Sequence, residues 1–180
     1  MKIGLISDTH VPDRAPGIPQ TVYRAFKGVD LILHAGDITD SRVIERLEEI
    51  APVIAVEGNM DRYNDYVNLK KSEIIEVENH KIGLIHGEVY PRGDIQQLAY
   101  KALELGVDIL VSGHSHIAHA EQVKNILLIN PGSPTAPRLS EPSVAIMDIE
   151  KNNVNVEFIK VGAATCSSLL FAEDRQKENK

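Results

Sequence analysis

The stretch "GLISDTH", residues 4–10, raises the question on which the fold assignment depends. Its first three residues place small or apolar side chains on both faces, which is typical of a buried strand. The strand then runs directly into a carboxylate and an imidazole, Asp8 and His10. Two explanations are open at this point: Asp8 caps a following helix, or the two side chains bind a ligand together. The rest of the chain has to decide between them.

The composition is that of a soluble globular protein. With 180 residues, 43% hydrophobic and 25% charged, we expect one domain with a substantial core. The single cysteine, Cys166, excludes a disulfide framework and a cysteine zinc site. Because the N-terminal apolar run is too short for a signal peptide or a membrane span, we expect a cytoplasmic protein with no membrane partner. The net charge of −7 argues against a long nucleic acid as partner, but it permits a small phosphorylated substrate where bound metal reverses the local charge.

Apolar runs alternate with helical patterns in the first half of the chain. This order predicts a parallel βαβαβ unit, with strands over 2–8, 31–37 and 52–59, and helices over 18–28 and from Val43 to Ile50. Asp40 or Ser41 is the expected cap of the second helix.

The second half predicts hairpins and one further helix. Its expected elements are a hairpin with its turn at Asn79-His80, a helix capped by Asp94, strands over 108–114, 126–130, 143–150 and 153–161, and a turn at Asn152-Asn153 between the last two.

Residues 163–180 differ from the rest, because small residues lead into the polar end "AEDRQKENK". We expect a domain over 1–162 followed by a frayed tail or a short packing helix. The apolar stretch "CSSLLFA" (166–172) makes this tail a candidate for self-association into a homo-oligomer.

Five of the predicted strands end in polar residues that can bind metal. The ends are Asp8-Thr9-His10, Gly36-Asp37, Gly58-Asn59-Met60-Asp61, His86-Gly87 and Gly113-His114-Ser115-His116. Ligands of open α/β sheets lie outside the carboxyl ends of the strands, and helix capping does not explain five coincident ends. Oxygen and imidazole donors without cysteine favour manganese, iron, zinc or nickel.

The number of donors favours two ions over one. The seven candidate metal ligands are Asp8, His10, Asp37, Asn59, His86, His114 and His116. Two ions that share a bridging carboxylate account for this number, and such a pair can bind both the attacking hydroxide and the departing oxygen of a phosphoryl group. The alternation of side chains along a strand predicts that Asp8 and His10, two residues apart, point toward one ion.

The motifs D-x-H, G-D, G-N-x-D, H-G and G-H-x-H follow one another in this order between residues 7 and 116, and "NPGS" follows at 130–133. This series resembles the calcineurin-like metallophosphoesterases. The short chain, with Met60 inside G-N-x-D, is most similar to small phosphodiesterases of the YfcE type, whose fold the eukaryotic Vps29 shares. The resemblance covers residues 1–161 and implies an α/β fold, a four-layer αββα sandwich with two central mixed β-sheets.

The resemblance also implies roles for the candidate ligands. Carried over position by position, one ion is bound by Asp8, His10 and His116, the other by Asn59, His86 and His114, and Asp37 bridges the two. The implied activity is hydrolysis of a small phosphodiester by in-line attack of a metal-bound hydroxide, with manganese as the expected metal and nickel, zinc, iron or magnesium as alternatives. A Vps29-like protein-interaction scaffold is the rival interpretation. A phosphomonoesterase or a nuclease of the same fold is a further alternative.

Met60 departs from the pattern of the larger family. Many members have a histidine there, proposed to protonate the leaving group, and a thioether has no proton to give. Asn59 and His86 are the remaining catalytic candidates at the strand ends. His119, three residues after the last candidate ligand, is the candidate for a replacement acid or a phosphate contact.

Other polar residues near the motifs have less specific interpretations. Asp61 either orients a metal ligand or caps a turn. Arg14 and Arg138 are candidates for phosphate contact, since they are the basic residues nearest in sequence to the predicted site loops. Asn130 and Ser133 belong either to a phosphate-binding loop or to a turn alone.

Two histidines are expected to lie outside the site. His34 falls inside a predicted strand, where we expect a core histidine with satisfied hydrogen bonds. His80 falls in a predicted turn, where we expect it to be solvated.

Overall fold

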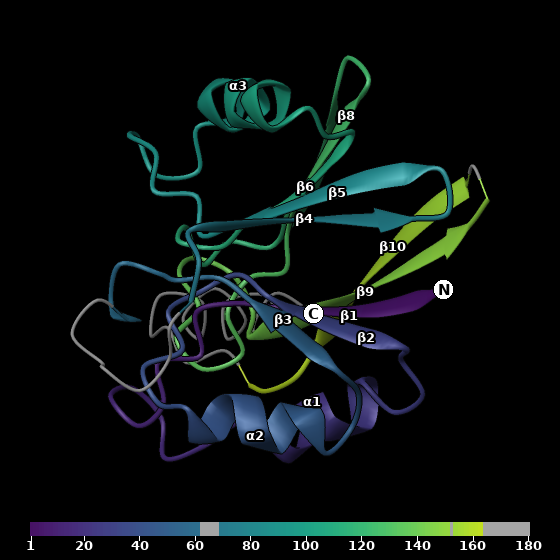
Figure 1. Cartoon of the computed structure of the whole chain (residues 1–180). Coiled ribbons are helices and arrows are strands. Elements are labelled where there is room, and N and C mark those ends of the chain that lie inside the picture. Colours follow the sequence, from purple (N-terminus) through teal and green to yellow (C-terminus); the bar gives the residue numbers. More distant parts are fainter. Residues whose placement is uncertain (62–68, 152, 164–180) are drawn as a thin grey trace, which may run out of the picture.

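The computed structural model describes residues 1–61, 69–151 and 153–163. Two five-stranded mixed sheets pack face to face, two helices cover the outer face of one sheet, and a third helix covers the other (Figure 1). This arrangement confirms the predicted four-layer αββα sandwich. The interpretations of the tail from 164 onward, as a frayed end, a packing helix or a self-association segment, lie outside the described residues.

The first sheet begins with the predicted parallel unit. Strands β1 (Lys2–Ile6), β2 (Leu31–His34) and β3 (Val53–Ala55) are parallel neighbours, with Leu5 opposite Leu33. Strands β9 (Ser143–Glu150) and β10 (Asn153–Lys160) continue the sheet beyond β1 as an antiparallel pair. Because β1 lies between β2 and β9 and is covered on both faces, its apolar run shows no alternation.

The second sheet has the order β4-β5-β6-β8-β7. Its strands are β4 (Ser72–Val77), β5 (His80–Ile85), β6 (Ile109–Val111), β7 (His119–Val123) and β8 (Ile126–Asn130). Strand β7 was not predicted, because this edge strand is polar and its middle residues are exposed.

The helices are α1 (Gln20–Ala25), α2 (Arg42–Glu48) and α3 (Ile95–Leu105). The predicted cap of α3 is confirmed, since the Asp94 carboxylate accepts a hydrogen bond from the Gln97 amide at 2.8 Å. At the start of α2 the Asp40 carboxylate accepts from the Arg42 amide at 2.9 Å, whereas Ser41 makes no side-chain cap bond. Of the two residues predicted to cap α2, Asp40 therefore supplies the bond.

Three apolar clusters hold the four layers together. The cluster between the sheets includes Leu5, Leu33 and Leu84, all fully buried. The two outer clusters pack the helices against the sheets. An added Cβ at Gly4, in β1, would lie 3.0 Å from the ring of Phe26. The absence of a side chain at Gly4 therefore lets the helical layer pack closely on β1.

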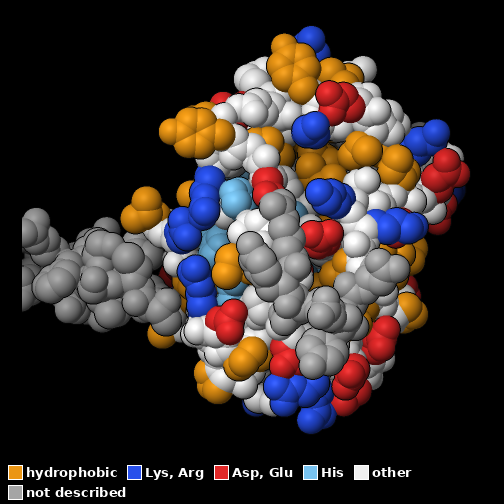
Figure 2. All heavy atoms as spheres, turned by 60° about the vertical axis from the view of Figure 1, so that its left-hand side comes forward, with side chains coloured by type: hydrophobic (Ala, Val, Ile, Leu, Met, Phe, Trp, Pro, Cys, Tyr) orange, Lys and Arg blue, Asp and Glu red, His pale blue; other side chains and the backbone are white. Residues whose placement is uncertain are grey.

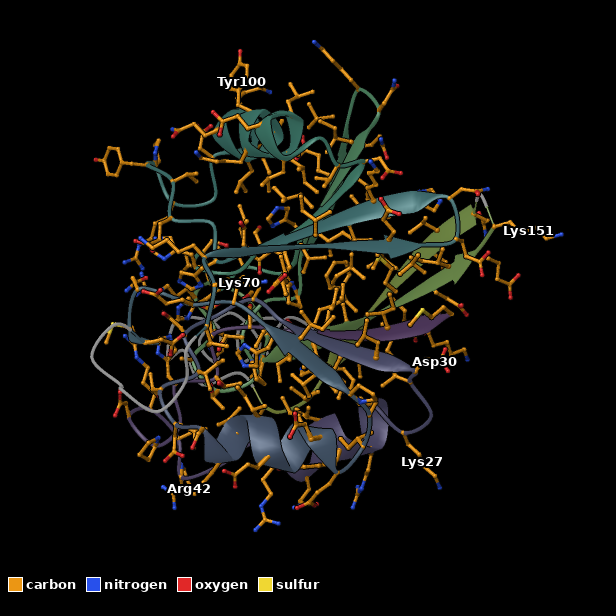
Figure 3. All side chains as sticks on the ribbon, in the orientation of Figure 1. Lys27, Asp30, Arg42, Lys70, Tyr100 and Lys151 are labelled. Atoms are coloured by element: carbon orange, nitrogen blue, oxygen red, sulfur yellow. The ribbon has the colours of Figure 1, made fainter. Side chains whose placement is uncertain are left out.

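Polar side chains project outward from these layers. Figure 3 shows the labelled Lys27 and Arg42 pointing away from the lower helical layer, and Tyr100 pointing away from α3. No helix in the described ranges is both long and apolar enough to span a lipid bilayer.

Two hairpin turns lie one residue earlier than predicted. Val77 pairs with His80, so the first turn consists of Glu78 and Asn79, and Asn153 pairs with Glu150, so Asn153 already belongs to β10. His80 is therefore the first residue of β5 and not a turn residue. The parallel strands also stop sooner than their apolar runs, and β1 ends at Ile6, before the polar residues.

Candidate metal centre

The ends of the neighbouring strands are tied together by their backbones. The Asp8 amide donates to the carbonyl of Gly36 at 3.0 Å, and the His10 amide donates to that of Asp37 at 3.0 Å. In the second sheet the Gly113 amide donates to the carbonyl of His86 at 3.0 Å. These bonds bring the carboxyl ends of β1 and β2, and those of β5 and β6, to common edges of the two sheets.

Five of the predicted ligands adopt the left-handed backbone conformation, which costs a non-glycine residue roughly 1–3 kcal/mol. Their φ angles are 53° at Asp8, 44° at His10, 56° at Asp37, 64° at His114 and 61° at His116. Asp8 and His10 lie beyond the end of β1, so strand alternation does not explain how they meet. The left-handed turns aim them instead, which corrects the prediction drawn from their spacing.

The first donor cluster contains Asp8, His10, Asp37 and His116. All four are buried, and one ligand atom from each lies within 4.8 Å of the others. Nε2 of His10 lies 3.4 Å from Nε2 of His116 and 3.5 Å from Oδ2 of Asp37. Nε2 of His116 lies 3.3 Å from Oδ1 of Asp8.

The second donor cluster contains Asn59, His86 and His114. Oδ1 of Asn59 lies 3.1 Å from Nε2 of His86 and 3.0 Å from Nδ1 of His114, and the two ring nitrogens are 3.2 Å apart. Nε2 of His86 also lies 3.5 Å from Oδ1 of Asp37. Asp37 therefore faces each cluster with one of its two carboxylate oxygens.

Backbone carbonyls determine which ring nitrogen faces the site. Nδ1–H of His86 donates to the carbonyl of Ala35 at 2.8 Å, and Nδ1–H of His116 donates to that of Ala136 at 2.5 Å. In the neutral rings, Nε2 then carries a lone pair directed into the site. Metal-binding histidines are commonly oriented in this way by a hydrogen bond on the other nitrogen.

Burial shifts the pKa values of these groups strongly. It raises the pKa of Asp8 to about 7, and it lowers the pKa of His10 to about 3 and that of His116 to about 4. Burial and the charge of His86 lower the pKa of His114 to about 4. Neutral imidazoles packed around buried carboxylates are the donor chemistry of a divalent transition metal, so these residues fit the predicted ions.

The motif glycines make room for the donors. A Cβ on Gly58 would lie 2.2 Å from the Asp37 amide nitrogen and 2.3 Å from its Oδ1. A Cβ on Gly113 would lie 2.7 Å from Oδ2 of Asp8. Any side chain at these two positions would displace a carboxylate, so the glycines permit the close approach of the backbone to the donors.

Asp61 holds the loops that carry two of the donors. Its Oδ1 accepts from the amides of Ile38 and Thr39, each at 2.8 Å, and its Oδ2 accepts from the Gly58 amide at 2.8 Å. Of the two predicted roles, the structure therefore favours orientation of the ligand loops. Met60 contributes its amide, which donates to Oδ1 of Asp37 at 2.8 Å, whereas its side chain is 42% exposed.

The "NPGS" segment forms hydrogen bonds with the backbone of the loops that carry the donors. The buried Ser133 hydroxyl donates to the carbonyl of Asp8 at 2.7 Å. The Asn130 side chain donates to the carbonyl of Gly113 at 2.7 Å and accepts from the Gly132 amide at 2.9 Å. Since these polar groups are used internally, the structure favours turn and support chemistry over a phosphate-binding loop.

The three remaining histidine interpretations have different outcomes. His34 is fully buried as predicted and lies 3.2 Å from the Thr9 hydroxyl, but its Nδ1 has no hydrogen-bond partner among the described residues. The expectation of a solvated His80 is wrong, because it hydrogen-bonds the Asp108 carboxylate at 2.6 Å and is 17% exposed. His119 begins β7, where its Nδ1–H donates to the Ile117 carbonyl at 3.2 Å, and no hydrogen bond joins it to either cluster within the described ranges. Its catalytic role stays a prediction.

Arg14 and Arg138, the two arginines predicted to contact phosphate, are hydrogen-bonded through their backbones to two histidines of the first donor cluster. The Arg14 amide donates to the carbonyl of His10 at 2.8 Å, and the Arg138 amide lies 3.4 Å from that of His116. Their charges act on both of these histidines. A third arginine, Arg92, acts on His114 and Arg138 and was missed, although its position between the His86-Gly87 motif and the cap Asp94 was a usable signal. Figure 2 shows basic side chains beside a group of histidine atoms that are visible on this face.

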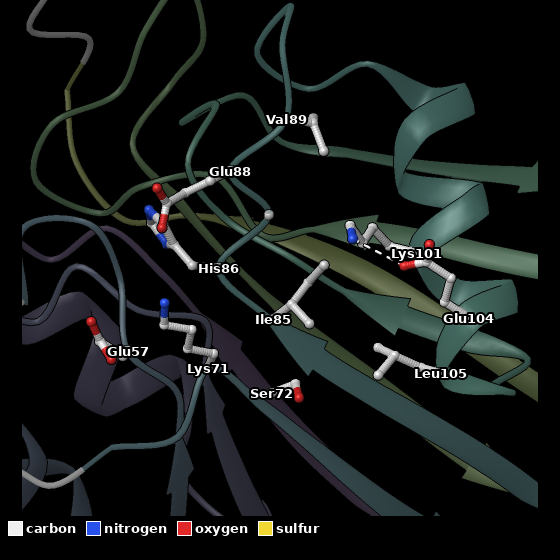
Figure 4. A pocket seen from close by; sticks show the side chains of 11 residues that line it. Glu57, Lys71, Ser72, Ile85, His86, Glu88, Val89, Lys101, Glu104 and Leu105 are labelled. Atoms are coloured by element: carbon white, nitrogen blue, oxygen red, sulfur yellow. Dashed lines mark hydrogen bonds and ion pairs between the residues drawn. The ribbon is translucent and has the colours of Figure 1, made fainter.

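A cavity of about 310 Å³ lies beside the second cluster, and His86 forms part of its wall. Figure 4 shows Ile85 and Leu105 on its apolar side and Lys71 near His86. Lys101 also lines it and is held by an ion pair with Glu104 at 2.9 Å. The cavity offers space next to the donors for the organic part of a ligand.

Comparisons with known proteins agree with this geometry. A sequence model of the calcineurin-like phosphoesterase superfamily domain matches residues 1–152. The curated "Probable metallophosphoesterase" of Methanothermobacter thermautotrophicus is 52% identical over 171 residues, which cover 95% of this chain and 99% of the relative.

Two solved structures extend the similarity. Vps29 from Entamoeba histolytica, crystallised with zinc, is 29% identical with a TM-score of 0.75, and the alignment covers 90% of this chain and all of the other. A structure described as a novel archaeal phosphodiesterase is 28% identical with a TM-score of 0.67, covering 88% of this chain and all of the other.

Proposed function

Because the chain belongs to the calcineurin-like phosphoesterase superfamily, we propose that it is a metal-dependent phosphodiesterase with a dinuclear centre. The observation that carries the proposal is the position of Asp37, whose two oxygens face the two donor clusters at 3.5 Å each. Manganese is the proposed metal, with nickel, zinc, iron or magnesium as alternatives. When bound, such ions polarise a phosphoryl oxygen and lower the pKa of water enough to supply a nucleophile near neutral pH.

The protein's own residues orient the donors and keep them available. One ion is assigned to Asp8, His10 and His116 and the other to Asn59, His86 and His114, with Asp37 between them. The carbonyls of Ala35 and Ala136 hold two of the rings with Nε2 inward, and Asp61 holds the loops of Asp37 and Asn59 in register. This preorganisation lowers the cost of assembling charge around the phosphoryl group.

The proposed preference for diesters rests on Met60 and on the archaeal relative. Without an acid at position 60, the leaving oxygen takes its proton from elsewhere, and loss of a general acid typically costs about 10²–10⁴-fold in rate. This cost is small for an aryloxide and large for an alkoxide. We therefore expect aryl phosphodiesters to be better substrates than alkyl monoesters, unless His119 supplies the proton.

The experiment combines metal content with turnover. Wild type is expected to bind two equivalents of manganese by mass spectrometry and to hydrolyse bis(p-nitrophenyl) phosphate. Asp37→Asn should lose both properties while keeping its thermal transition. Asp30→Asn is the matched control, because Asp30 lies at the opposite end of β2, where its carboxylate accepts a hydrogen bond from the Lys2 amide. One ion or none in metal-replete wild type would contradict the dinuclear centre.

A Vps29-like scaffold is the second candidate function, favoured by the similarity to Vps29 over the full length of that chain. The two candidates differ in turnover. A metal-replete protein that binds two ions but hydrolyses neither diesters nor monoesters would support the scaffold and contradict the phosphodiesterase.

A further inference from the structure

Three arginines lie on segments that contact the histidine segments of the metal centre. Arg14 and Arg138 are attached through their amides to the carbonyls of His10 and His116. Arg92 precedes Gly93, which packs so closely on the loop between His114 and His116 that an added Cβ would lie 3.2 Å from Cβ of Ser115. The three side chains are therefore supplied by three separate loops that all contact the histidine segment or its partners.

These arginines form no ion pair with a described carboxylate, although the charge of Asp8 acts on Arg138 from a distance. All three are exposed, and their guanidinium groups make no ion pair or hydrogen bond with a described residue. They are also close enough for the charges of Arg14 and Arg92 to act on Arg138. Three like charges repel one another, and they remain without ion pairs to described residues although the chain has 26 Asp and Glu against 19 Lys and Arg.

The proposed metal ions do not need these charges to bind a simple diester. A phosphodiester carries one negative charge, and two divalent ions exceed the two carboxylate charges of Asp8 and Asp37 before any arginine is counted. A planar guanidinium forms paired, charge-assisted hydrogen bonds with phosphate oxygens. The cluster thus has the chemistry to bind a second anionic group beside the reacting one.

The neighbours of the arginines indicate that this anion belongs to an organic molecule. Tyr90 is 87% exposed and lies two residues before Arg92, and Leu139 is 75% exposed and directly follows Arg138. Large apolar side chains at such exposure beside a cationic cluster are typical of surfaces that contact a ring or a sugar as well as a phosphate.

We propose that Arg14, Arg92 and Arg138 form a subsite for a second phosphate, so that the preferred substrates are phosphodiesters that also carry a phosphate monoester. This inference rests on the proposed phosphodiesterase activity. It identifies the class of substrate by charge: a diester with an additional phosphate is preferred over the same diester without it.

A matched pair of chromogenic substrates tests the subsite. Thymidine 5′-(p-nitrophenyl phosphate) and its 3′-phosphorylated derivative have the same scissile bond and leaving group and differ by one phosphate. We expect wild type to show a kcat/KM at least about tenfold higher for the phosphorylated substrate, as charge-assisted hydrogen bonds would provide. The preference should decrease with rising salt concentration.

Arginine variants test whether the preference for the phosphorylated substrate depends on the three side chains. Arg14→Gln, Arg92→Gln and Arg138→Gln keep the backbone amides, and each should reduce the preference several-fold, with the triple variant bringing it close to one. Arg24→Gln is the matched control, since Arg24 is an exposed arginine on α1 in the outer layer. It should keep the wild-type preference. Thermal melts of all variants check the fold.

A binding measurement separates this inference from the proposed function. Calorimetry of the metal-loaded protein compares thymidine 3′,5′-bisphosphate with thymidine 5′-phosphate and needs no turnover. Tighter binding of the bisphosphate that is lost in the triple variant supports the subsite, even if neither diester is hydrolysed and the proposed activity fails. Equal affinities and equal kcat/KM values in wild type, or a preference that the triple variant retains, would overturn the subsite.

Discussion

The two ends of the sheets contain the same unusual backbone conformation for different reasons. At the hairpin turns, Glu78, Lys124 and Lys151 have φ angles of 53°, 53° and 55°, and all three are exposed. At the metal centre, Asp8 and Asp37 have φ angles of 53° and 56°, and both are buried. The comparison teaches that strain in a turn follows from chain reversal in two residues, whereas strain at the centre is kept because only those side chains supply the donors.

The largest expected effect comes from removing the space that the strained donors need. Gly58→Ala places a Cβ against the Asp37 amide and carboxylate, although it changes no donor. We expect loss of bound metal and of phosphodiesterase activity by more than about 100-fold, together with a destabilisation of roughly 1–3 kcal/mol from overpacking. Metal analysis and kinetics measure the first two, and denaturant unfolding measures the third.

Gly17→Ala is the control for this change, because a Cβ there meets nothing within 4 Å. It should retain metal and activity. Normal metal content in Gly58→Ala would show that the centre tolerates displacement of Asp37 and that its geometry is less exacting than the contacts indicate.

A smaller effect is expected from loosening the loops without crowding them. Asp61→Ala removes the acceptor of three backbone amides, at Ile38, Thr39 and Gly58. Groups that orient metal ligands typically contribute about 10–100-fold to metal affinity or activity, and we expect a loss in this range. Titration with manganese gives the affinity. An unchanged affinity would mean that the loops hold the donors without Asp61.

The next expected effect is a pH dependence of metal affinity, which arises because the donors of the centre are buried and the turn residues are not. Burial raises the pKa of Asp8 from 3.8 to about 7, and a metal ion must displace that proton. Metal affinity should therefore fall about tenfold per pH unit below pH 7 and level off above it. His10, His114 and His116 do not compete in this range, because burial lowers their pKa values to about 3 or 4.

The raised pKa of Asp8 has the opposite effect on the stability of the metal-free protein, which falls as the pH rises. A carboxyl whose pKa is raised on folding contributes stability that is fully present below pH 3.8 and is lost as the pH rises through 7. Metal titrations and thermal melts between pH 6 and pH 8 measure both trends. An affinity independent of pH across this interval would contradict the assignment of Asp8 as a donor.

The smallest effect is expected in a turn. Lys124→Gly relieves a left-handed backbone conformation at an exposed position outside the two donor clusters. We expect a gain of about 0.5–1 kcal/mol in the free energy of unfolding and unchanged activity. Urea unfolding of both proteins measures the gain. A loss of stability would show that the lysine contributes contacts that outweigh the strain.

Much of the fold was predictable because its signals are local. The parallel order of β1, β2 and β3 follows from apolar runs separated by helical patterns, and "ILLIN" and "SVAIMDIE" correspond to β8 and β9 in full. Strand β7 gave no apolar signal, because an edge strand covered on one side is stabilised by pairing with β8 rather than by burial. His80 was misread for a related reason, since its partner Asp108 is 28 residues away.

The sequence by itself determined the chemistry of the site: which donors exist, that they follow strand ends, and that Asp61 and the motif glycines accompany them. The division of the donors between two ions was implied by the family resemblance and not by their spacing, and only the tertiary structure supplies the contacts that correspond to it. His114 meets Asn59 and His86, whereas His116 meets Asp8 and His10, and Arg92 and Arg14 come close enough to Arg138 for their charges to act on it. The physical reason is that strand ends carry their residue types in the local sequence, but the left-handed turns and the packing of two sheets that aim them depend on contacts between residues far apart in the chain.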